Sequence, residues 1–243
     1  MTSRPGATFV RGDGSDDRPG APPDRVRRDF DRIALLENQG WDANVHYHDR
    51  LLEELPSRVR EGLDLGCGIG AFTRRLAERS DRVLGIDLSP NMIRLARERT
   101  AHPNVDYREA DATTWEWPRG RFDVVASIAT LHHLPFEKTL VRMRDALAPG
   151  GTLVVLDLFQ WEGAWGFARA AASLPASWWR RLRATGRLRP DPEVAAAWAE
   201  HGKVDRYMTL SRVRAASDRV LPGAVVSPRL YWRYTLVWQK PGT

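Results

Sequence analysis

Two adjacent histidines, His132 and His133, are the residues of this chain best suited to moving a proton. An imidazole titrates near neutral pH, so it can take a proton from a hydroxyl or a phenol during a reaction. Both follow the apolar run "FDVVASIAT", which is typical of a buried strand. Two interpretations remain open. Either the pair contains a general base, or one imidazole bonds a loop backbone while the other faces solvent.

Other residues of reactive type carry less information. His46 and His48 lie two positions apart, and on a helix that spacing turns them to different faces, so a shared metal ion is not expected. The sequence therefore predicts no metal site. Cys67 is the only cysteine, which excludes a disulfide within this chain. It lies in a glycine-rich loop, where we interpret it as a small filler and not as a nucleophile.

The stretch "LDLGCGIG", followed by Ala71, has three alternating glycines and also reads as a dinucleotide fingerprint. A glycine loop between a strand and a helix lets the backbone approach a ligand and aims free N–H groups at it. Asp87 lies 21 residues after Gly66, where its carboxylate can accept hydrogen bonds from two ribose hydroxyls. These features alone fit NAD, FAD or another adenosine cofactor.

Asp64 begins to separate those cofactors, because it stands two residues before Gly66. A carboxylate this close would repel a diphosphate but would tolerate a ligand that carries an ammonium group. S-adenosylmethionine carries both an ammonium and a sulfonium. The alternative is that Asp64 only caps the amides of the loop.

Strands and helices alternate from residue 62 onward, and this order predicts a parallel, doubly wound sheet. We expect strands at 62–66, 82–88, 104–111, 121–130 and 152–159, and helices at 71–80, 89–100 and 136–151. Residues 25–56 look helical with a break near Gly40. A further helix is expected at 209–222, and two strands at 224–240 with a turn at Ser227–Pro228. Ligands of such sheets bind beyond the carboxyl ends of the strands.

The amino-acid composition limits the classes of protein to which this chain can belong. The 243 residues are 42% hydrophobic, which suits one α/β domain with an insertion. No apolar run approaches the roughly 18 residues of a membrane span, and no secretory signal is visible, so we expect a cytoplasmic protein. Arginine far outnumbers lysine, which suggests a GC-rich bacterial source. The net charge is +6, but acidic residues are interspersed among the basic ones along the chain, so nucleic-acid binding is not favoured.

Five ordered motifs resemble the class I S-adenosylmethionine-dependent methyltransferases, in particular the bacterial group with ubiquinone/menaquinone-type and natural-product enzymes. They are "LDLGCGIG", "VLGIDLSPNMI", "VDYREADATTW", "FDVVASIATLHHL" and "LAPGGTLVVLDLF". The resemblance implies a Rossmann-like seven-stranded sheet in the order 3-2-1-4-5-7-6 with strand 7 antiparallel. It also implies S-adenosyl-L-methionine as the cofactor and a transferase activity.

The resemblance assigns roles by position. Gly66 and Gly68 would pack against the methionine part of the cofactor, Asp64 would lie near its amino group and Asp87 would hold the ribose. The remaining predicted contacts are Leu88, Met92, Asp111 and Ala112 at the adenine, Ser127 at the sulfonium end and Tyr47 closing over the cofactor. Asp111 has an alternative role as a cap of the following turn.

The expected domain organisation follows. Residues 1–24 are a disordered leader, 25–56 a helical cap, 57–159 the cofactor-binding core, 160–208 a helical lid, and 209–243 the elements that complete the core. The lid is rich in Trp and Arg and would cover the acceptor, or merely pack on the core. We expect a small-molecule acceptor, with oxygen or carbon favoured over nitrogen. A methyltransferase for RNA or protein, a regulatory S-adenosylmethionine-binding protein and a dinucleotide oxidoreductase remain alternatives, and the sequence does not report the oligomeric state.

Overall fold

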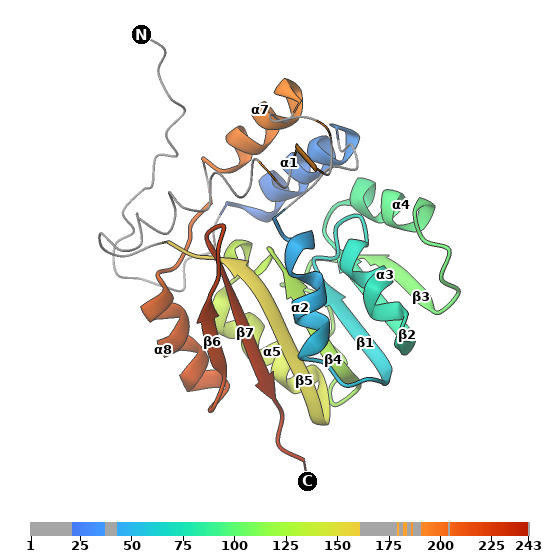
Figure 1. The fold of residues 1–243 in the computed structure, drawn as a ribbon, viewed down its shortest axis with the longest axis vertical. Helices are drawn as coiled ribbons and strands as arrows, with labels where there is room; N and C mark the ends of the chain where they lie inside the picture. Colours follow the sequence, from blue (N-terminus) through green and yellow to red (C-terminus); the bar gives the residue numbers. More distant parts are fainter. Residues whose placement is uncertain are drawn as a thin grey trace.

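A seven-stranded sheet forms the centre of the computed structural model, with its strands in the order β3-β2-β1-β4-β5-β7-β6 (Figure 1). Strands β1 to β5 run parallel, and β7 is antiparallel to both of its neighbours. The predicted topology is therefore confirmed. The strands are β1 Val59–Leu65, β2 Ser80–Asp87, β3 Val105–Glu109, β4 Phe122–Ile128, β5 Leu147–Leu158, β6 Val225–Pro228 and β7 Arg233–Gln239.

The structure describes residues 21–36, 43–160, 179, 182, 183, 186, 191–203 and 205–242. The predicted leader lies almost wholly outside these residues, and so does most of the predicted lid, including Trp161, Trp165, Trp178, Arg180, Arg181, Arg187 and Arg189. Within the described residues, no helix combines the length and the apolar character that crossing a membrane would need.

Helices cover both faces of the sheet because its central strands are apolar on both sides. In β4, Val125 belongs to a buried cluster with helix α5, whereas its neighbour Val124 belongs to a second cluster on the opposite face. Figure 1 shows α2 and α3 on one face and α5 and α8 on the other. The helices are α1 Pro23–Leu36, α2 His48–Glu53, α3 Ala71–Ala77, α4 Pro90–Glu98, α5 Phe136–Ala146, α7 Pro192–His201 and α8 Leu210–Val220, with 3₁₀ helices η1 Val45–Tyr47 and η2 Leu131–His133.

The start of α4 shows how the sequence sets an element boundary next to the site. Ser89 has an extended backbone, and its hydroxyl accepts a hydrogen bond from the Met92 amide at 3.1 Å. Pro90 occupies the first helical position, where its missing N–H costs nothing. The predicted N-cap is confirmed, and it fixes the chain directly after Asp87 at the end of β2.

Several predicted boundaries differ from the structure, and two of these differences have a clear physical reason. The helix expected at 136–151 ends at Ala146, because Leu147 already pairs with Phe122 of β4 and lies fully buried there. The turn expected at Ser227–Pro228 lies further on, because these two residues still pair with β7. The chain reverses at Tyr231 and Trp232, whose φ angles are +60° and +58°.

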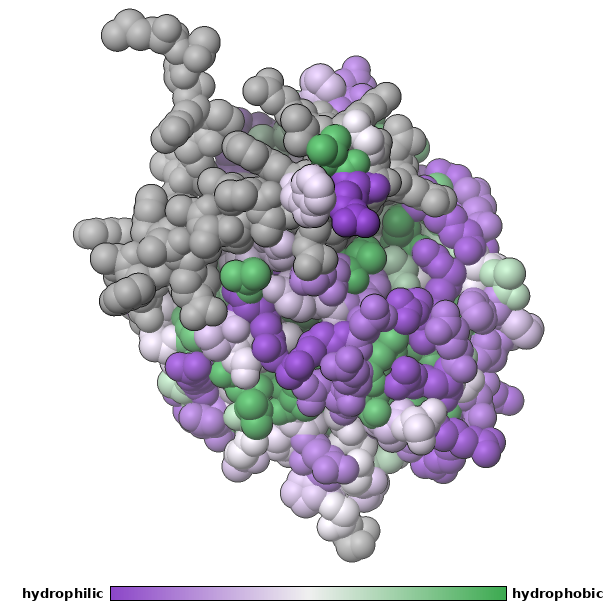
Figure 2. All heavy atoms as spheres, viewed as in Figure 1, coloured by the Kyte–Doolittle hydropathy of each residue, from purple (hydrophilic) through white to green (hydrophobic). Residues whose placement is uncertain are grey.

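Hydrophilic residues cover most of the described surface in the view of Figure 2, and hydrophobic residues show in smaller patches between them. Three of the large exposed apolar side chains belong to the predicted lid: Trp179 is 60%, Trp198 is 45% and Leu182 is 37% exposed. Both tryptophans are therefore partly open to solvent. Helix α7 instead packs on α1 through Ala197, which joins a buried cluster with Ile33 and Met92.

Candidate functional site

The glycine loop after β1 is held in a left-handed conformation at Gly66, Gly68 and Gly70. A β-carbon at Gly66 would lie 2.0 Å from Thr130 Oγ1, and one at Gly70 would lie 2.2 Å from the Tyr107 hydroxyl. A β-carbon at Gly68 would meet no heavy atom of the described residues within 4 Å. Gly66 and Gly70 are therefore packing glycines, while Gly68 leaves an open cradle in which a ligand can approach the backbone.

Asp87 ties the end of β2 to this cradle. Its Oδ2 accepts a hydrogen bond from the Gly68 amide, and its Oδ1 accepts one from the Ser89 amide, both at 2.9 Å. Burial, with a contribution from the nearby Asp31 charge, raises the pKa of this carboxyl above its ordinary value. The predicted ribose-binding residue therefore stands at the loop, with its carboxylate oriented by two backbone amides.

Asp64 lies beneath the loop, and its side chain is 1% exposed. Its Oδ2 accepts a hydrogen bond of 2.6 Å from the Thr73 hydroxyl in the first turn of α3. Burial raises its pKa to about 7, and the charge of Asp87 adds to the effect. The bond from Thr73 places this carboxyl against helix α3. A carboxyl so costly to ionise suits a ligand that brings a compensating cation.

The predicted adenine side is less simple. Asp111 Oδ1 accepts hydrogen bonds from both the amide and the hydroxyl of Thr113, at 2.8 and 2.7 Å, so the turn-capping alternative describes this oxygen. The Ala112 carbonyl accepts bonds from Trp117 and Arg142. Leu88 is partly buried, and Met92 is buried where α4 meets α1. Contacts of these residues with an adenine stay predictions.

Ser127 and Tyr47 both use their hydroxyls within the protein. Ser127 is fully buried and donates to the Leu65 carbonyl at 3.1 Å, which joins the ends of β4 and β1. The Tyr47 hydroxyl donates to the Leu230 carbonyl at 3.2 Å, on the connection between β6 and β7. Roles at the sulfonium end and as a closing side chain are not tested by these contacts.

His46 and His48 diverge, as their spacing predicts. The His46 ring lies 5.8 Å from the Tyr231 ring, whereas the His48 ring packs edge-on to Phe72 at 5.2 Å. Cys67 is buried, and that burial raises the pKa of its thiol well above the ordinary value, which disfavours the reactive thiolate and agrees with the interpretation of Cys67 as a small filler.

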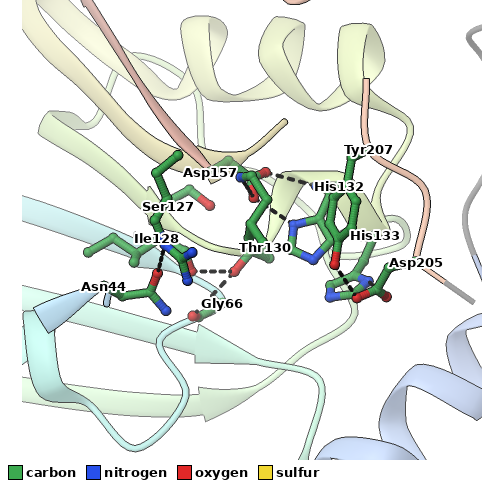
Figure 3. A network of polar contacts seen from close by, with 12 residues as sticks. Asn44, Gly66, Ser127, Ile128, Thr130, His132, His133, Asp157, Asp205 and Tyr207 are labelled. Carbon is green, nitrogen blue, oxygen red and sulfur yellow. Dashed lines mark hydrogen bonds and ion pairs between the residues drawn. The ribbon is translucent and has the colours of Figure 1, made fainter. Parts of the chain in front are cut away.

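Thr130, which the sequence reasoning missed, links the glycine loop to the two adjacent histidines (Figure 3). Its hydroxyl donates to the Ile128 carbonyl at 3.0 Å and lies 3.5 Å from the Gly66 carbonyl. Ala129 before it has a φ of +52°, which turns the chain sharply out of β4. His132 and His133 follow at once in η2, so they lie beside the glycine loop.

His132 pairs with a buried carboxylate. Its Nδ1 lies 2.6 Å from Asp157 Oδ1, and its backbone amide donates to Asp157 Oδ2 at 2.9 Å (Figure 3). The side chains are 6% and 1% exposed. Burial alone would lower the pKa of His132, but the Asp157 carboxylate reverses the effect and raises it. Neither histidine fits the expected alternative of a loop-bonded imidazole beside a solvent-facing one.

His133 belongs to a group that we call the histidine cluster, which consists of His132, His133, His201 and Asp205. The His133 side chain is 7% exposed, and its Nδ1 lies 3.6 Å from Asp205 Oδ1. Burial holds its pKa far below the ordinary value, and the charges of the neighbouring histidines add to this, so this imidazole is neutral. Tyr207 donates to Asp205 Oδ2 at 2.7 Å and its ring lies 5.3 Å from that of His132.

The sequence reasoning missed Asp157, His201, Asp205 and Tyr207. A signal existed for Asp157, because it ends β5 at the same edge of the sheet as the predicted residues. No signal existed for the other three, which come from α7 and the segment before α8. The packing of α7 on α1 brings His201 to the site, and the Gln160 amide, which donates to the Met208 carbonyl at 2.9 Å, holds the segment before α8 at the end of β5.

Comparisons with known proteins agree with this geometry. Residues 63–151 match the family model described as a methyltransferase domain. An uncharacterized methyltransferase of Mycobacterium tuberculosis is 31% identical over 211 residues, covering 84% of this chain and 99% of that protein. The 27-O-demethylrifamycin SV methyltransferase of Amycolatopsis mediterranei is 31% identical over 159 residues, covering 56% and 58% of the two chains.

A solved structure shares the fold. The complex of DhpI with S-adenosylhomocysteine superposes with a TM-score of 0.61 at 20% identity, covering 90% of this chain and 97% of that one. The glycine cradle and the buried carboxyls at the ends of β1 and β2 fit a nucleoside ligand that carries a cation. The chain therefore belongs to the class I S-adenosylmethionine-dependent methyltransferases, and its cofactor is S-adenosyl-L-methionine.

Proposed function

We propose that this enzyme moves the methyl group of S-adenosylmethionine to a small-molecule acceptor, with oxygen or carbon favoured over nitrogen as the acceptor atom. The observation that carries the proposal is the buried His132–Asp157 pair. His132 lies two residues after Thr130, whose hydroxyl contacts the Gly66 carbonyl of the glycine loop. The bound cofactor supplies a methyl group already activated by its sulfonium. What the chain must add is alignment, exclusion of water and removal of a proton from the acceptor.

The cofactor side of this proposal rests on the loop. Gly66 shapes the loop and Gly68 opens the cradle, Asp64 would face the cationic methionine end, and Asp87 would hold the ribose. The remaining assignments stand as proposed contacts with the cofactor: Leu88, Met92, Asp111 and Ala112 at the adenine, Ser127 near the sulfonium, and Tyr47 above it.

The acceptor side rests on the histidine cluster. A hydroxyl or an acidic C–H gives up a proton when it is methylated, whereas a neutral amine needs no base before the transfer. A cluster of buried imidazoles and carboxylates is suited to the first case. We therefore propose that His132 and His133 act as catalytic residues, with Asp157 positioning His132. The cap at 25–56 and the lid at 160–208 would enclose the acceptor.

The class of acceptor draws support from the relatives. The rifamycin enzyme acts, by its name, on a small molecule, and this chain is similar to it over about half of its length. A bacterial, cytoplasmic enzyme of small-molecule metabolism agrees with the composition and with the single cysteine.

The test separates binding from turnover. Calorimetry with S-adenosylhomocysteine and NAD, followed by a screen of hydroxylated small molecules against RNA and protein substrates, should find the nucleoside bound and a small hydroxylated molecule methylated. His132→Ala and His133→Ala should each slow turnover at least 100-fold while cofactor affinity stays within about twofold, with His102→Ala as the matched control. Cofactor binding without turnover on any substrate would favour a regulatory protein, and salt-sensitive turnover on RNA alone would sink the small-molecule proposal.

A further inference from the structure

Two buried atoms of the histidine cluster have no hydrogen-bond partner among the described residues: Asp205 Oδ1 and His201 Nε2. They lie 3.6 Å apart, and His133 Nδ1 also lies 3.6 Å from Asp205 Oδ1. Hydrogen bonds between such atoms measure about 2.7–3.2 Å. A buried carboxylate oxygen left unpaired costs about 1–3 kcal/mol or more. At 3.6 Å these atoms are too far apart to bond one another, so a further bound group between the side chains would satisfy them.

The spacing suits a metal ion. Ligand atoms at about 2.0–2.2 Å from a tetrahedral Zn²⁺ lie about 3.3–3.6 Å from one another, which includes the two separations of 3.6 Å found here. His132, His133 and Asp205 each offer one ligand atom, and these atoms lie within 4.8 Å of one another. A small inward movement of the side chains would bring the three to coordination distance.

Three of the four side chains of the histidine cluster are also oriented by an outer partner. Asp157 Oδ1 lies 2.6 Å from Nδ1 of His132, so in the neutral ring the lone pair lies on Nε2. Tyr207 donates to Oδ2 of Asp205 at 2.7 Å and leaves Oδ1. Asp29 of α1 lies 3.2 Å from Nδ1 of His201 and leaves Nε2. A carboxylate behind a ligating histidine is the usual outer partner in metalloproteins, where it fixes the tautomer.

We propose that His132, His133 and Asp205 bind one divalent transition-metal ion of the Zn²⁺ class, with His201 Nε2 as an adjacent donor. This differs from the expectation of no metal, because that expectation considered only His46 and His48. Two or three imidazoles with one carboxylate favour Zn²⁺, Co²⁺, Ni²⁺ or Fe²⁺ over Mg²⁺ and Ca²⁺, which prefer all-oxygen sites.

The ion would have a use in the reaction. Binding of the metal is independent of the proposed function, but its use rests on that function. With an open coordination position, it would hold the acceptor oxygen and lower the pKa of its hydroxyl. In this arrangement His132 and His133 would act as ligands and not as bases, so the hydroxyl proton would leave to solvent. The oxygen would bond to the methyl carbon, and the C–S bond would break with its electron pair staying on sulfur. The ion would also join η2 to the segment after α7.

The experiment uses the full chain, free of any affinity tag, stripped with a chelator and titrated with ZnCl₂, CoCl₂ and MgCl₂ by calorimetry. We expect one Zn²⁺ per chain at micromolar or tighter affinity, visible absorption bands from bound Co²⁺, and no Mg²⁺ binding in the same range. Asp205→Asn should weaken Zn²⁺ binding at least 100-fold, and Tyr207→Phe about 10-fold, since outer partners typically contribute 10–100-fold. His102→Ala should leave it unchanged.

The outcomes are separable. Affinity for S-adenosylhomocysteine reports whether each variant is folded, and it should not depend on Asp205. Zn²⁺ affinity that is weaker than millimolar, or that is unchanged in Asp205→Asn, overturns the metal site. Turnover that persists in excess chelator while His132→Ala is inactive assigns proton removal to His132 alone and overturns the metal's use. Failure to find any acceptor would sink the proposed function and leave the measured Zn²⁺ affinity standing.

Discussion

Thr130 fills the space that a side chain at Gly66 would need: a β-carbon there would lie 2.0 Å from its Oγ1 and 2.7 Å from its Cβ. The glycine loop after β1 is therefore in direct contact, at Thr130, with the segment after β4 that carries the two histidines. A displacement of one segment displaces the other. Because methyl transfer depends on alignment, this contact matters as much as any single polar group.

The three loop glycines give a matched comparison. Gly66→Ala should destabilise the protein by about 3 kcal/mol, because strain in the left-handed region adds to the clash with Thr130. Gly68→Ala carries only the backbone strain, about 1 kcal/mol, since its β-carbon has open space. Thermal unfolding checks both values. Calorimetry with S-adenosylhomocysteine should show Gly68→Ala losing at least tenfold in affinity, and equal effects of the two variants on stability would contradict the different roles of these glycines.

Asp64 predicts a pH effect on stability. Its pKa is raised by burial to about 7 in the folded protein, above the ordinary value of 3.8. The folded state therefore holds this proton more tightly than the unfolded state does. Its contribution to stability is complete below about pH 4 and is lost as the pH rises through about 7. Unfolding of ligand-free Asp64→Asn should lack this component, which urea titrations between pH 5 and 8 would measure.

The same carboxyl predicts proton release. A cationic group at the methionine end of the cofactor would favour ionised Asp64, so binding near pH 6.5 should expel a proton. Calorimetry in buffers of different ionisation enthalpy measures that proton directly. Release of the same fraction by wild type and Asp64→Asn would place the cation elsewhere.

Asp87 accepts hydrogen bonds from the loop backbone, and it is also the proposed contact of the cofactor ribose. Asp87→Asn keeps the shape of the side chain but removes its charge, so the hydrogen bonds from the Gly68 and Ser89 amides weaken. We expect cofactor affinity to fall at least 30-fold, measured by calorimetry, with a smaller loss of stability. Asp106→Asn, on an exposed residue of β3, is the control. An unchanged dissociation constant for Asp87→Asn would refute the ribose assignment.

Helix α1 is attached to α4 through Asp31. Its Oδ1 accepts hydrogen bonds from the Ser89 hydroxyl at 2.5 Å and from the Asn91 amide at 3.3 Å. Asp31→Ala should lower stability by about 1–2 kcal/mol, because it leaves the buried Ser89 hydroxyl without its acceptor. The exposed Arg27–Glu109 pair also joins α1 to the core, yet Glu109→Ala should cost less than about 0.5 kcal/mol. Chemical denaturation of both variants tests this contrast.

The sheet could be predicted from the sequence because its signals are local. Glycines, N-caps and apolar runs mark each boundary between strand and helix, and Ser89 and Pro90 fall where expected. The boundary at Ala146 was missed because Pro149 and Gly150 resemble a helix stop, although the strand already begins at Leu147. Pairing with β4 decides that boundary, and pairing is not visible in the sequence.

The site divides in the same way. Asp64, Asp87 and the glycines stand at strand ends, where a general rule for open sheets places ligands. Asp205 and Tyr207 come from much later in the chain, in the segment between α7 and α8. They lie beside His133 and His132, near the contact of α7 with α1. Their residue types and spacing carry no recognisable pattern. Tertiary packing alone assembles that half of the site.

Strand β7 lies between β5 and β6 although it is the last strand to be synthesised. On the ribosome, β5 is complete at residue 158, while its neighbour begins only at residue 233. At about 5–20 residues per second, the apolar edge of β5 stays unpaired for on the order of ten seconds. An open apolar edge is a template for aggregation. The nascent chain is therefore exposed to aggregation during that interval, and we expect its soluble yield to fall when synthesis of residues 159–232 is slowed at constant temperature.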